Sequence, residues 1–202
     1  MTKLKTAVLI SGRGSNLQAL IDACGQPDFP AEIVLVFSNV ADAYGLERAR
    51  KAGIPTAAIS HRDFATRDAF DMAMDAKLTE AKAEFICLAG FMRLLSATFV
   101  RKWQGRIVNI HPSLLPAFKG MHVHEQAIAA GVKVSGCTVH YVIPELDSGP
   151  TILQEKVPVQ PGDTADTLAA RVLEAEHRIY PAALKMIAEG RVRLEQDRAI
   201  FA

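Results

Sequence analysis

Short apolar runs rich in β-branched residues alternate with longer segments of helical period along the first half of this chain. Each run is followed by enough residues for a helical crossover, so the alternation predicts an α/β fold with a Rossmann-like, mostly parallel sheet and helices on both faces. Gly53 stands where a helix-terminating glycine is expected. The expected strands are 6–10, 33–37, 56–59, 85–88 and 107–110, and the expected helices are 16–24, 43–52, 67–83 and 96–104.

The pattern changes after residue 111. Asp163 or Thr164 is placed to cap a long helix, and Pro181 is a candidate for a bend in it. The charged residues from Arg191 onward are expected to form a tail. In chain order, the expected elements here are a Pro-bounded loop, a short helix near 124–130, antiparallel strands over 137–142 and 151–157, and the long helix to residue 188.

Composition limits the classes of function. The chain has 202 residues, half of them hydrophobic and 22% charged, which supplies a core and excludes disordered, collagen-like and disulfide-scaffold proteins. The formal net charge of +1 gives no general field for nucleic acid or an acidic membrane, although a local phosphate site is compatible with it. We expect one domain over 1–202, with a nucleotide-binding-like half over about 1–105 and a second half over about 106–202.

Targeting and redox signals are weak. The apolar run 6–10 is too short for a signal peptide, and the longest one, 85–92, is too short to span a bilayer. The three cysteines are widely spaced and lack a Cys-x-x-Cys pair, so we expect reduced thiols. These features predict a cytoplasmic protein without a membrane partner.

The first candidate site is the segment 11–16, Ser-Gly-Arg-Gly-Ser-Asn, between the first strand and the first helix. Glycines allow a close backbone approach, and free N–H groups at a helix start favour an anion, so the segment predicts a small phosphate site. A tight strand-to-helix turn without a ligand is an equal alternative. Ser15 and Gln18 also fit a capping box. The dinucleotide fingerprint fails because the third glycine is missing and Ser38-Asn39 replace the ribose-binding acid.

The second candidate is the pair Asn109 and His111 at the carboxyl end of a predicted parallel strand, where open α/β sheets bind ligands. An amide donor beside an imidazole suits oxyanion stabilisation with proton transfer. Core polar residues satisfied by the backbone are the alternative. Asp147, in a later loop, is a candidate partner for the His111 ring, although Asp-Ser-Gly-Pro is also ordinary turn chemistry.

Four histidines, at 111, 122, 124 and 140, raise the possibility of a metal site. His122 and His124 would share a face of a strand, as in some metal sites. No cysteine or tight carboxylate pattern completes a ligand set, so we expect no metal. A hydrolase using Ser113 is disfavoured because no Gly-x-Ser-x-Gly elbow is present.

Taken together, these segments resemble the phosphoribosylglycinamide formyltransferases, folate-dependent enzymes of purine biosynthesis, over nearly the whole chain. The Asn-x-His-Pro-Ser run with a downstream Asp is typical of formyltransferases in general, and the Gly-x-Gly-Ser-Asn loop is typical of this branch. One departure lies at 118–121, where some relatives carry a proline before the glycine. The matching segments are 11–17, 37–39, 88–93, 109–116, 145–150 and 176–177.

The resemblance implies the formyltransferase fold and transfer of the formyl group of 10-formyltetrahydrofolate to the amine of glycinamide ribonucleotide. The products are formylglycinamide ribonucleotide and tetrahydrofolate. It implies two small-molecule substrates, no metal, no nucleic acid, and a monomer or homodimer.

The same resemblance implies residue roles. Asn109, His111 and Asp147 would be catalytic: Asn109 donates to the oxyanion of a tetrahedral intermediate, His111 as imidazolium supports it and the leaving nitrogen, and Asp147 holds the ring. Ribonucleotide binding would fall to Gly14, Ser15, Asn16, Leu173, Glu174, Ala175 and Glu176. Folate binding would fall to Arg67, Met92, Arg93, Leu94, Leu95, Asn109, Ile143, Pro144, Glu145, Leu146 and Asp147.

Three alternatives stay open. Formyltetrahydrofolate deformylase and methionyl-tRNA formyltransferase share the Asn, His and Asp residues, but the first usually has an amino-terminal regulatory domain and the second a carboxyl-terminal RNA-binding domain. The chain begins at its first strand and ends soon after its last helix, so we expect neither addition. A non-catalytic sensor of a phosphorylated metabolite would keep the glycine loop without needing Asn109 and His111.

Overall fold

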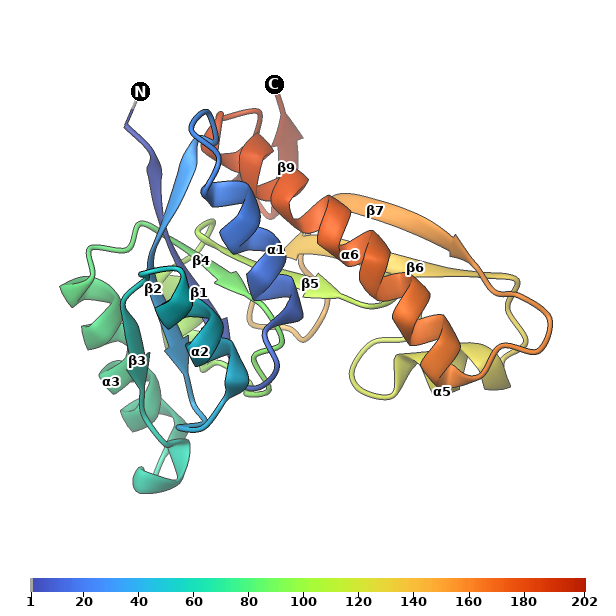
Figure 1. Ribbon diagram of the computed structural model, residues 1–202, viewed down its shortest axis with the longest axis horizontal. Coiled ribbons are helices and arrows are strands. Elements are labelled where there is room, and N and C mark those ends of the chain that lie inside the picture. Colours follow the sequence, from blue (N-terminus) through green and yellow to red (C-terminus); the bar gives the residue numbers. More distant parts are fainter. Residues whose placement is uncertain (1) are drawn as a thin grey trace.

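The computed structural model describes residues 2–202 and contains a seven-stranded sheet in the order β3-β2-β1-β4-β5-β6-β7 (Figure 1). The pairs among β1 to β5 are parallel, whereas β6 pairs antiparallel with both β5 and β7. This confirms the predicted mostly parallel sheet with late antiparallel strands. The strands are β1 Leu4–Ile10, β2 Ala31–Ser38, β3 Thr56–Ala58, β4 Phe85–Leu88, β5 Ile107–His111, β6 Val134–Tyr141 and β7 Thr151–Pro158.

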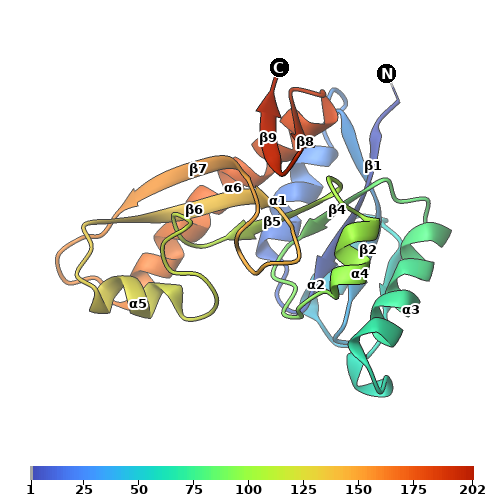
Figure 2. The ribbon, with the colours of Figure 1, turned by 180° about the vertical axis from the view of Figure 1, so that it is seen from behind.

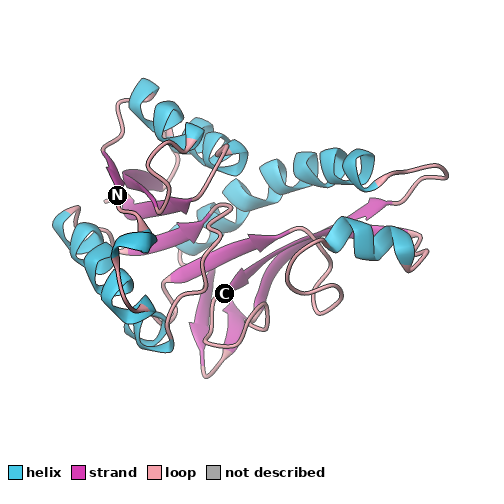
Figure 3. Cartoon of the chain, turned by 90° about the horizontal axis from the view of Figure 1, so that it is seen from below, coloured by secondary structure: helices cyan, strands magenta, loops and turns pink. Residues whose placement is uncertain are grey.

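Helices cover both faces of the sheet. In Figure 1, α1 and α6 lie in front of it, and Figure 2 shows α3 and α4 on the opposite side. The view from below in Figure 3 separates these layers. The helices are α1 Ser15–Cys24, α2 Tyr44–Lys51, α3 Arg67–Glu80, α4 Ala97–Lys102, α5 Val123–Ala129 and α6 Ala165–Ala188, with a 3₁₀ turn, η1, at His61–Asp63.

Strand alternation divides the core into two layers. In β1, Val8 and Ile10 pack with residues of α1, α2 and α6, whereas Ala7 and Leu9 pack with residues of α3 and α4. Apolar residues on both faces of β1 follow from burial of a central parallel strand on both sides. Tyr180 of α6 donates its hydroxyl to the Leu88 carbonyl at 2.8 Å, which ties this helix to the middle of the sheet.

Local signals account for several helix boundaries. Thr164 caps α6 through a reciprocal capping box with Thr167, as expected of one of the two candidate caps. Gly53 follows α2 with a φ of 71°, the left-handed conformation expected of a terminating glycine. Pro181 lies inside α6, which continues to Ala188.

Two local expectations are wrong. Ser15 and Gln18 do not form a capping box, because Ser15 is already the first helical residue and Gly14 precedes it with a φ of 70° and no side-chain cap. Gln18 instead donates to Asp22 at 2.8 Å. The residues after 191 are not a simple tail but an antiparallel hairpin, β8 Val192–Glu195 and β9 Arg198–Phe201, since Val192 packs into the core beside α6.

Candidate functional site

Asn109 and His111 lie on one face of β5, as strand alternation predicts. The intervening residue Ile110 belongs to the core layer under α1 and α6, so the two polar side chains point to the opposite face. Asn109 is paired with Leu88 of β4 on one side and with His140 of β6 on the other. The pair therefore lies within the sheet, where neighbouring strands restrict its side chains.

The structure places Asp147 beside the His111 ring. His111 Nδ1 lies 3.5 Å from Asp147 Oδ2, and the two side chains are only 6% and 7% exposed. The backbone N–H of Gly120 donates to the same Asp147 oxygen at 2.9 Å, and Asp147 itself has a φ of 47°. The carboxylate is thus held in a turn that aims it at the ring.

The other nitrogen of the His111 ring also faces an acceptor. Nε2 is 2.9 Å from the carbonyl oxygen of Phe118, and Ser113 donates to that carbonyl at 3.1 Å. A carbonyl only accepts, so the Nε2 atom carries a hydrogen in this arrangement. Because both ring nitrogens face oxygens, the doubly protonated ring can donate at both ends. To donate to a substrate from Nε2, the ring must first leave the Phe118 carbonyl.

His140 orients the amide of Asn109. His140 Nδ1 lies 2.9 Å from the Tyr141 carbonyl, and its Nε2 lies 3.3 Å from Asn109 Nδ2. Burial lowers the pKa of His140, which favours the neutral ring that donates from Nδ1 and accepts at Nε2. One amide hydrogen of Asn109 is then used, and the other stays available. The position of His140 in the chain suggests only a metal-ligand role, because its place opposite Asn109 depends on strand pairing.

The glycine-containing segment connects β1 to α1. A Cβ atom on Gly14 would lie 2.8 Å from the Gly45 Cα atom, and a Cβ on Gly45 would lie 2.4 Å from an Ile10 methyl group. Gly45 N–H donates to the Gly12 carbonyl at 2.9 Å. The tight-turn interpretation therefore explains these glycines, and it leaves the start of α1 accessible to a ligand.

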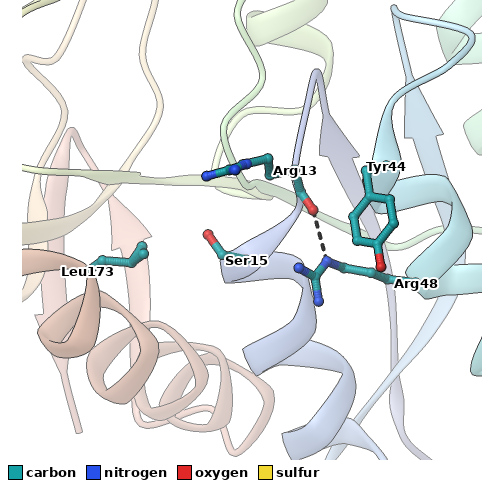
Figure 4. A pocket seen from close by; sticks show the side chains of 5 residues that line it. All are labelled: Arg13, Ser15, Tyr44, Arg48 and Leu173. Atoms are coloured by element: carbon teal, nitrogen blue, oxygen red, sulfur yellow. Dashed lines mark hydrogen bonds between the residues drawn. The ribbon is translucent and has the colours of Figure 1, made fainter. Parts of the chain in front are cut away.

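A cavity of about 460 Å³ opens beside this turn (Figure 4). Its lining contains two guanidinium groups, from Arg13 and Arg48, and no carboxylate. Figure 4 shows the Ser15 hydroxyl turned toward Arg13 and Leu173. Arg48 donates to the Arg13 carbonyl at 2.8 Å and lies over the Tyr44 ring. This local positive charge suits an anion, in a chain whose net charge is near zero.

Asn16 and Glu176, far apart in sequence, meet between α1 and α6. Asn16 Nδ2 donates to Glu176 Oε2 at 2.7 Å, while Asn16 Oδ1 is buried and has no hydrogen-bond partner among residues 2–202. Burial raises the pKa of Glu176 to about 7, against the lowering effect of the Asn16 hydrogen bond. The pair offers a free acceptor and a carboxylate that titrates near neutral pH.

The other expected ribonucleotide residues on α6 occupy different faces of the helix. Leu173 lines the cavity, whereas Glu174 is exposed and Ala175 is fully buried in the core. None of Asn109, His111 and Asp147 lines this cavity. The structure thus brings Ser15 and Leu173 together, and the side chain of Ala175 faces away from solvent.

The expected folate residues are contributed by three segments. Arg67 is exposed at the start of α3. Leu95 packs against the core layer that contains residues of α3 and α4, and so does Val142, the residue before Ile143. The Arg93 guanidinium lies 5.6 Å from the centre of the Phe70 ring, and its Nε atom is buried with no hydrogen-bond partner in the described part of the chain. Several of these residues are apolar and strongly exposed, namely Met92 at 65%, Leu94 at 54% and Leu146 at 51%. Pro144 and Glu145 are also exposed in the loop before Asp147.

The histidine-rich region forms no metal centre among residues 2–202, where no group of three or more His, Cys, Asp or Glu side chains could hold an ion. His122 and His124 do not share a strand face, because His122 precedes α5 and His124 lies within it. The three cysteines are free, as expected. No helix in the described part of the chain is long and apolar enough to cross a membrane.

A family model described as formyl transferase matches residues 4–184 of this chain. The chain belongs to the formyl transferase family. The phosphoribosylglycinamide formyltransferase of Escherichia coli (strain K12) is 47% identical over 196 residues, which cover 97% of this chain and 92% of that enzyme. A solved structure of glycinamide ribonucleotide transformylase 1 from Symbiobacterium toebii superposes with a TM-score of 0.95 at 47% identity, over 98% of this chain and 94% of that one.

Longer relatives contain a similar segment. The trifunctional purine biosynthetic protein adenosine-3 of Bos taurus is 56% identical over 198 residues, which are 98% of this formyltransferase chain but 20% of that protein. The chain thus spans about a fifth of the length of these trifunctional relatives and nearly all of the bacterial ones.

Proposed function

We propose that this chain transfers the formyl group of 10-formyltetrahydrofolate to the amine of glycinamide ribonucleotide in purine biosynthesis. The observation that carries this proposal is the contact between His111 and Asp147 beside Asn109, close to strand ends that also adjoin an anion-favouring loop. The relatives named phosphoribosylglycinamide formyltransferase support the same substrate pair.

In the proposed reaction, the substrate amine forms a bond to the formyl carbon and the bond from that carbon to the folate nitrogen breaks. Asn109 donates its free amide hydrogen to the oxygen that becomes negative. His111, with Nδ1 held by Asp147 and Nε2 released from the Phe118 carbonyl, stabilises the same charge and delivers a proton from Nε2 to the departing folate nitrogen. The proton lost by the attacking amine leaves through Asp147 or water. Holding both reactants in the required orientation contributes as much as the acid–base groups.

We assign the folate to the segments around Met92–Leu95 and Ile143–Asp147. The exposed apolar side chains Met92, Leu94 and Leu146 suit an aromatic ring system, and the unpartnered Arg93 Nε suits an acceptor. Arg67 at the start of α3 supplies a further positive charge for a carboxylate-bearing ligand.

We assign the ribonucleotide phosphate to the start of α1, where the backbone N–H groups of Gly14, Ser15 and Asn16 precede the first intrahelical hydrogen bond, from Gln18 N–H to the Gly14 carbonyl. Arg13 and Arg48 add positive charge to the cavity beside it. Leu173, Glu174 and Glu176 border the rest of the substrate, and the buried Asn16 Oδ1 is free to accept a hydrogen bond from it. Ala175 supports this side of α6 from the core.

A steady-state assay tests the proposal. We expect purified protein to form tetrahydrofolate from 10-formyltetrahydrofolate only when glycinamide ribonucleotide is present. Replacing Asn109 by Ala is expected to lower kcat by roughly a hundred- to a thousandfold, the usual effect of removing one oxyanion donor. Asn109→Asp, which keeps the shape but replaces the donor by an acceptor, is expected to be equally impaired.

The same assay separates the alternatives. Release of formate at an equal rate without the ribonucleotide would identify a deformylase. Binding of the ribonucleotide without turnover would indicate a sensor. Near wild-type turnover by Asn109→Ala or by His111→Ala would refute the assigned roles.

A further inference from the structure

The proposed folate segment Met92–Leu95 has no regular secondary structure, so something else must hold its backbone. Its far end is anchored in the core, where Ser96 N–H donates to the buried carboxylate of Asp71 at 2.7 Å. Its near end starts from the Ala89–Gly90 turn after β4, with Gly90 at a φ of 73°. Met92 and Leu94 between these ends are exposed, so packing alone does not define their positions.

Ser11 anchors the near end through two hydrogen bonds. Its backbone N–H donates to the Gly90 carbonyl at 3.1 Å, and its hydroxyl oxygen accepts from Met92 N–H at 2.8 Å. Ser11 is the last residue before the glycine turn at Gly12, and a hydroxyl there reaches the segment across the carboxyl ends of β1 and β4. Without that hydroxyl, Met92 N–H would have no partner in the described structure.

Asn39 in turn orients the Ser11 hydroxyl. Ser11 donates to Asn39 Oδ1 at 2.5 Å, and Asn39 Nδ2 lies 3.2 Å from His61 Nδ1. Asn39 is only 4% exposed, so its amide has little freedom to turn away. The bonds form a directed series from Met92 N–H through the Ser11 hydroxyl to the Asn39 carbonyl oxygen. Each member fixes the hydrogen position of the next.

We propose that Ser11, oriented by Asn39, is a positioning residue for the folate segment, through the hydrogen bond from Met92 N–H. The inference rests on the proposed function because it assigns that segment to the folate. The Ser11 side chain is directed at this segment and not at the cavity that Arg13 and Ser15 line. Removing the Ser11 hydroxyl is therefore expected to weaken the binding of the folate and to leave that of the ribonucleotide unchanged.

The test measures kcat, both KM values and the Kd of a folate analogue that carries no transferable formyl group. Ser11→Ala is expected to raise the folate KM and Kd about five- to tenfold, the effect of one hydrogen bond. The ribonucleotide KM is expected to stay within about twofold, and kcat at saturation to stay above about half of wild type. Ser11→Thr, which keeps the hydroxyl, is expected to restore the folate Kd.

Asn39→Ala removes the acceptor that orients the Ser11 hydroxyl. It tests the same interaction if Ser11→Ala does not fold. We expect it to raise the folate Kd, and the double variant to bind no more weakly than the weaker single one, because both remove one interaction. Ser38→Ala is the matched control: the Ser38 hydroxyl lies at the same sheet edge, but within the described structure it bonds only to Val40 backbone atoms. It is expected to leave both KM values unchanged.

An unchanged folate Kd in Ser11→Ala would overturn the inference. A parallel rise in both KM values, with no rescue by Ser11→Thr, would also overturn it and would indicate a structural role only. If wild-type protein binds the folate analogue but transfers no formyl group to glycinamide ribonucleotide, the proposed function fails, while the Kd comparison still decides the role of Ser11.

Discussion

Replacing Glu176 by Gln will stabilise the protein above pH 7 and will have little effect near pH 5. Glu176 is 6% exposed on the inward face of α6, and Asn16 Nδ2 donates to it. Within residues 2–202, no Lys, Arg or His nitrogen lies within 4.0 Å of its carboxylate. Burial without a compensating charge raises the pKa of this carboxyl group from 4.5 to about 7.

The sign and size of the effect follow from proton linkage. Between pH 4.5 and 7 the folded chain holds more protons on Glu176 than the unfolded chain, so stability falls as pH rises through this interval. One pKa unit corresponds to about 1.4 kcal/mol, so ionised Glu176 lowers the free energy of unfolding by roughly 3 kcal/mol above pH 7. Gln cannot ionise, and Glu176→Gln avoids this loss.

Urea denaturation at pH 5 and pH 8 measures the difference. We expect Glu176→Gln to exceed wild type by less than about 1 kcal/mol at pH 5 and by about 3 kcal/mol at pH 8, with unchanged m-values. Glu174→Gln is the control, because Glu174 is exposed on the same helix. A stability difference that does not change between the two pH values would refute the reasoning.

The same substitution connects stability to binding. If Glu176 accepts a hydrogen bond from the ribonucleotide, binding favours the ionised carboxylate, so wild-type affinity should rise as pH passes 7. The ratio of wild-type to Glu176→Gln affinity cancels the titration of the substrate itself. We expect this ratio to increase from pH 6 to pH 8. A constant ratio would show that Glu176 does not accept a hydrogen bond from the ribonucleotide.

Gly14→Ala is expected to cost about 1 kcal/mol more in urea denaturation than Gly53→Ala, because both have a positive φ but only a Cβ at Gly14 meets backbone, the Gly45 Cα atom; equal losses would contradict this. His140→Ala removes the acceptor that orients the Asn109 amide, so kcat should fall about tenfold while both KM values change little; a full kcat would exclude the orienting role. Formyl transfer should persist in excess EDTA, since no metal step is proposed, and activity lost to the chelator and restored by zinc would overturn the mechanism.

Much of the architecture could be predicted from the chain because it depends on local periodicity. The run at β1 alternates between two core layers, and the caps at Thr164 and Gly53 follow from side-chain and backbone chemistry within a few residues. The hairpin of β8 and β9 at the end of the chain could not be predicted in this way. β8 and β9 are only four residues each, and the exposed residues of β8, Arg193 and Glu195, are charged. Their place is decided by contact with α6 and β6, including the bond from the Tyr141 hydroxyl to the Val192 carbonyl.

The candidate site divides in the same way. Asn109 and His111 could be paired from strand alternation, and Asp147 was a candidate only through resemblance and chemistry until the folded loop placed it at 3.5 Å. The role of His140 could not be predicted, because it depends on which residue of β6 stands opposite Asn109. Antiparallel register is decided by the whole sheet and not by the strand's own residues.

The amino-acid sequence by itself determined the order of strands and helices, the glycine turn after the first strand and the amide–imidazole pair, because each depends on residues close together in the chain. Tertiary structure alone decided that Asn16 meets Glu176, that the Phe118 carbonyl bonds to His111 Nε2, and that Ser11 reaches Met92. These contacts join segments whose approach depends on how helices pack on the sheet and how loops close. A hydrogen bond requires its two atoms to lie about 3 Å apart, and for residues far apart in the chain only the packing of the folded structure brings them that close.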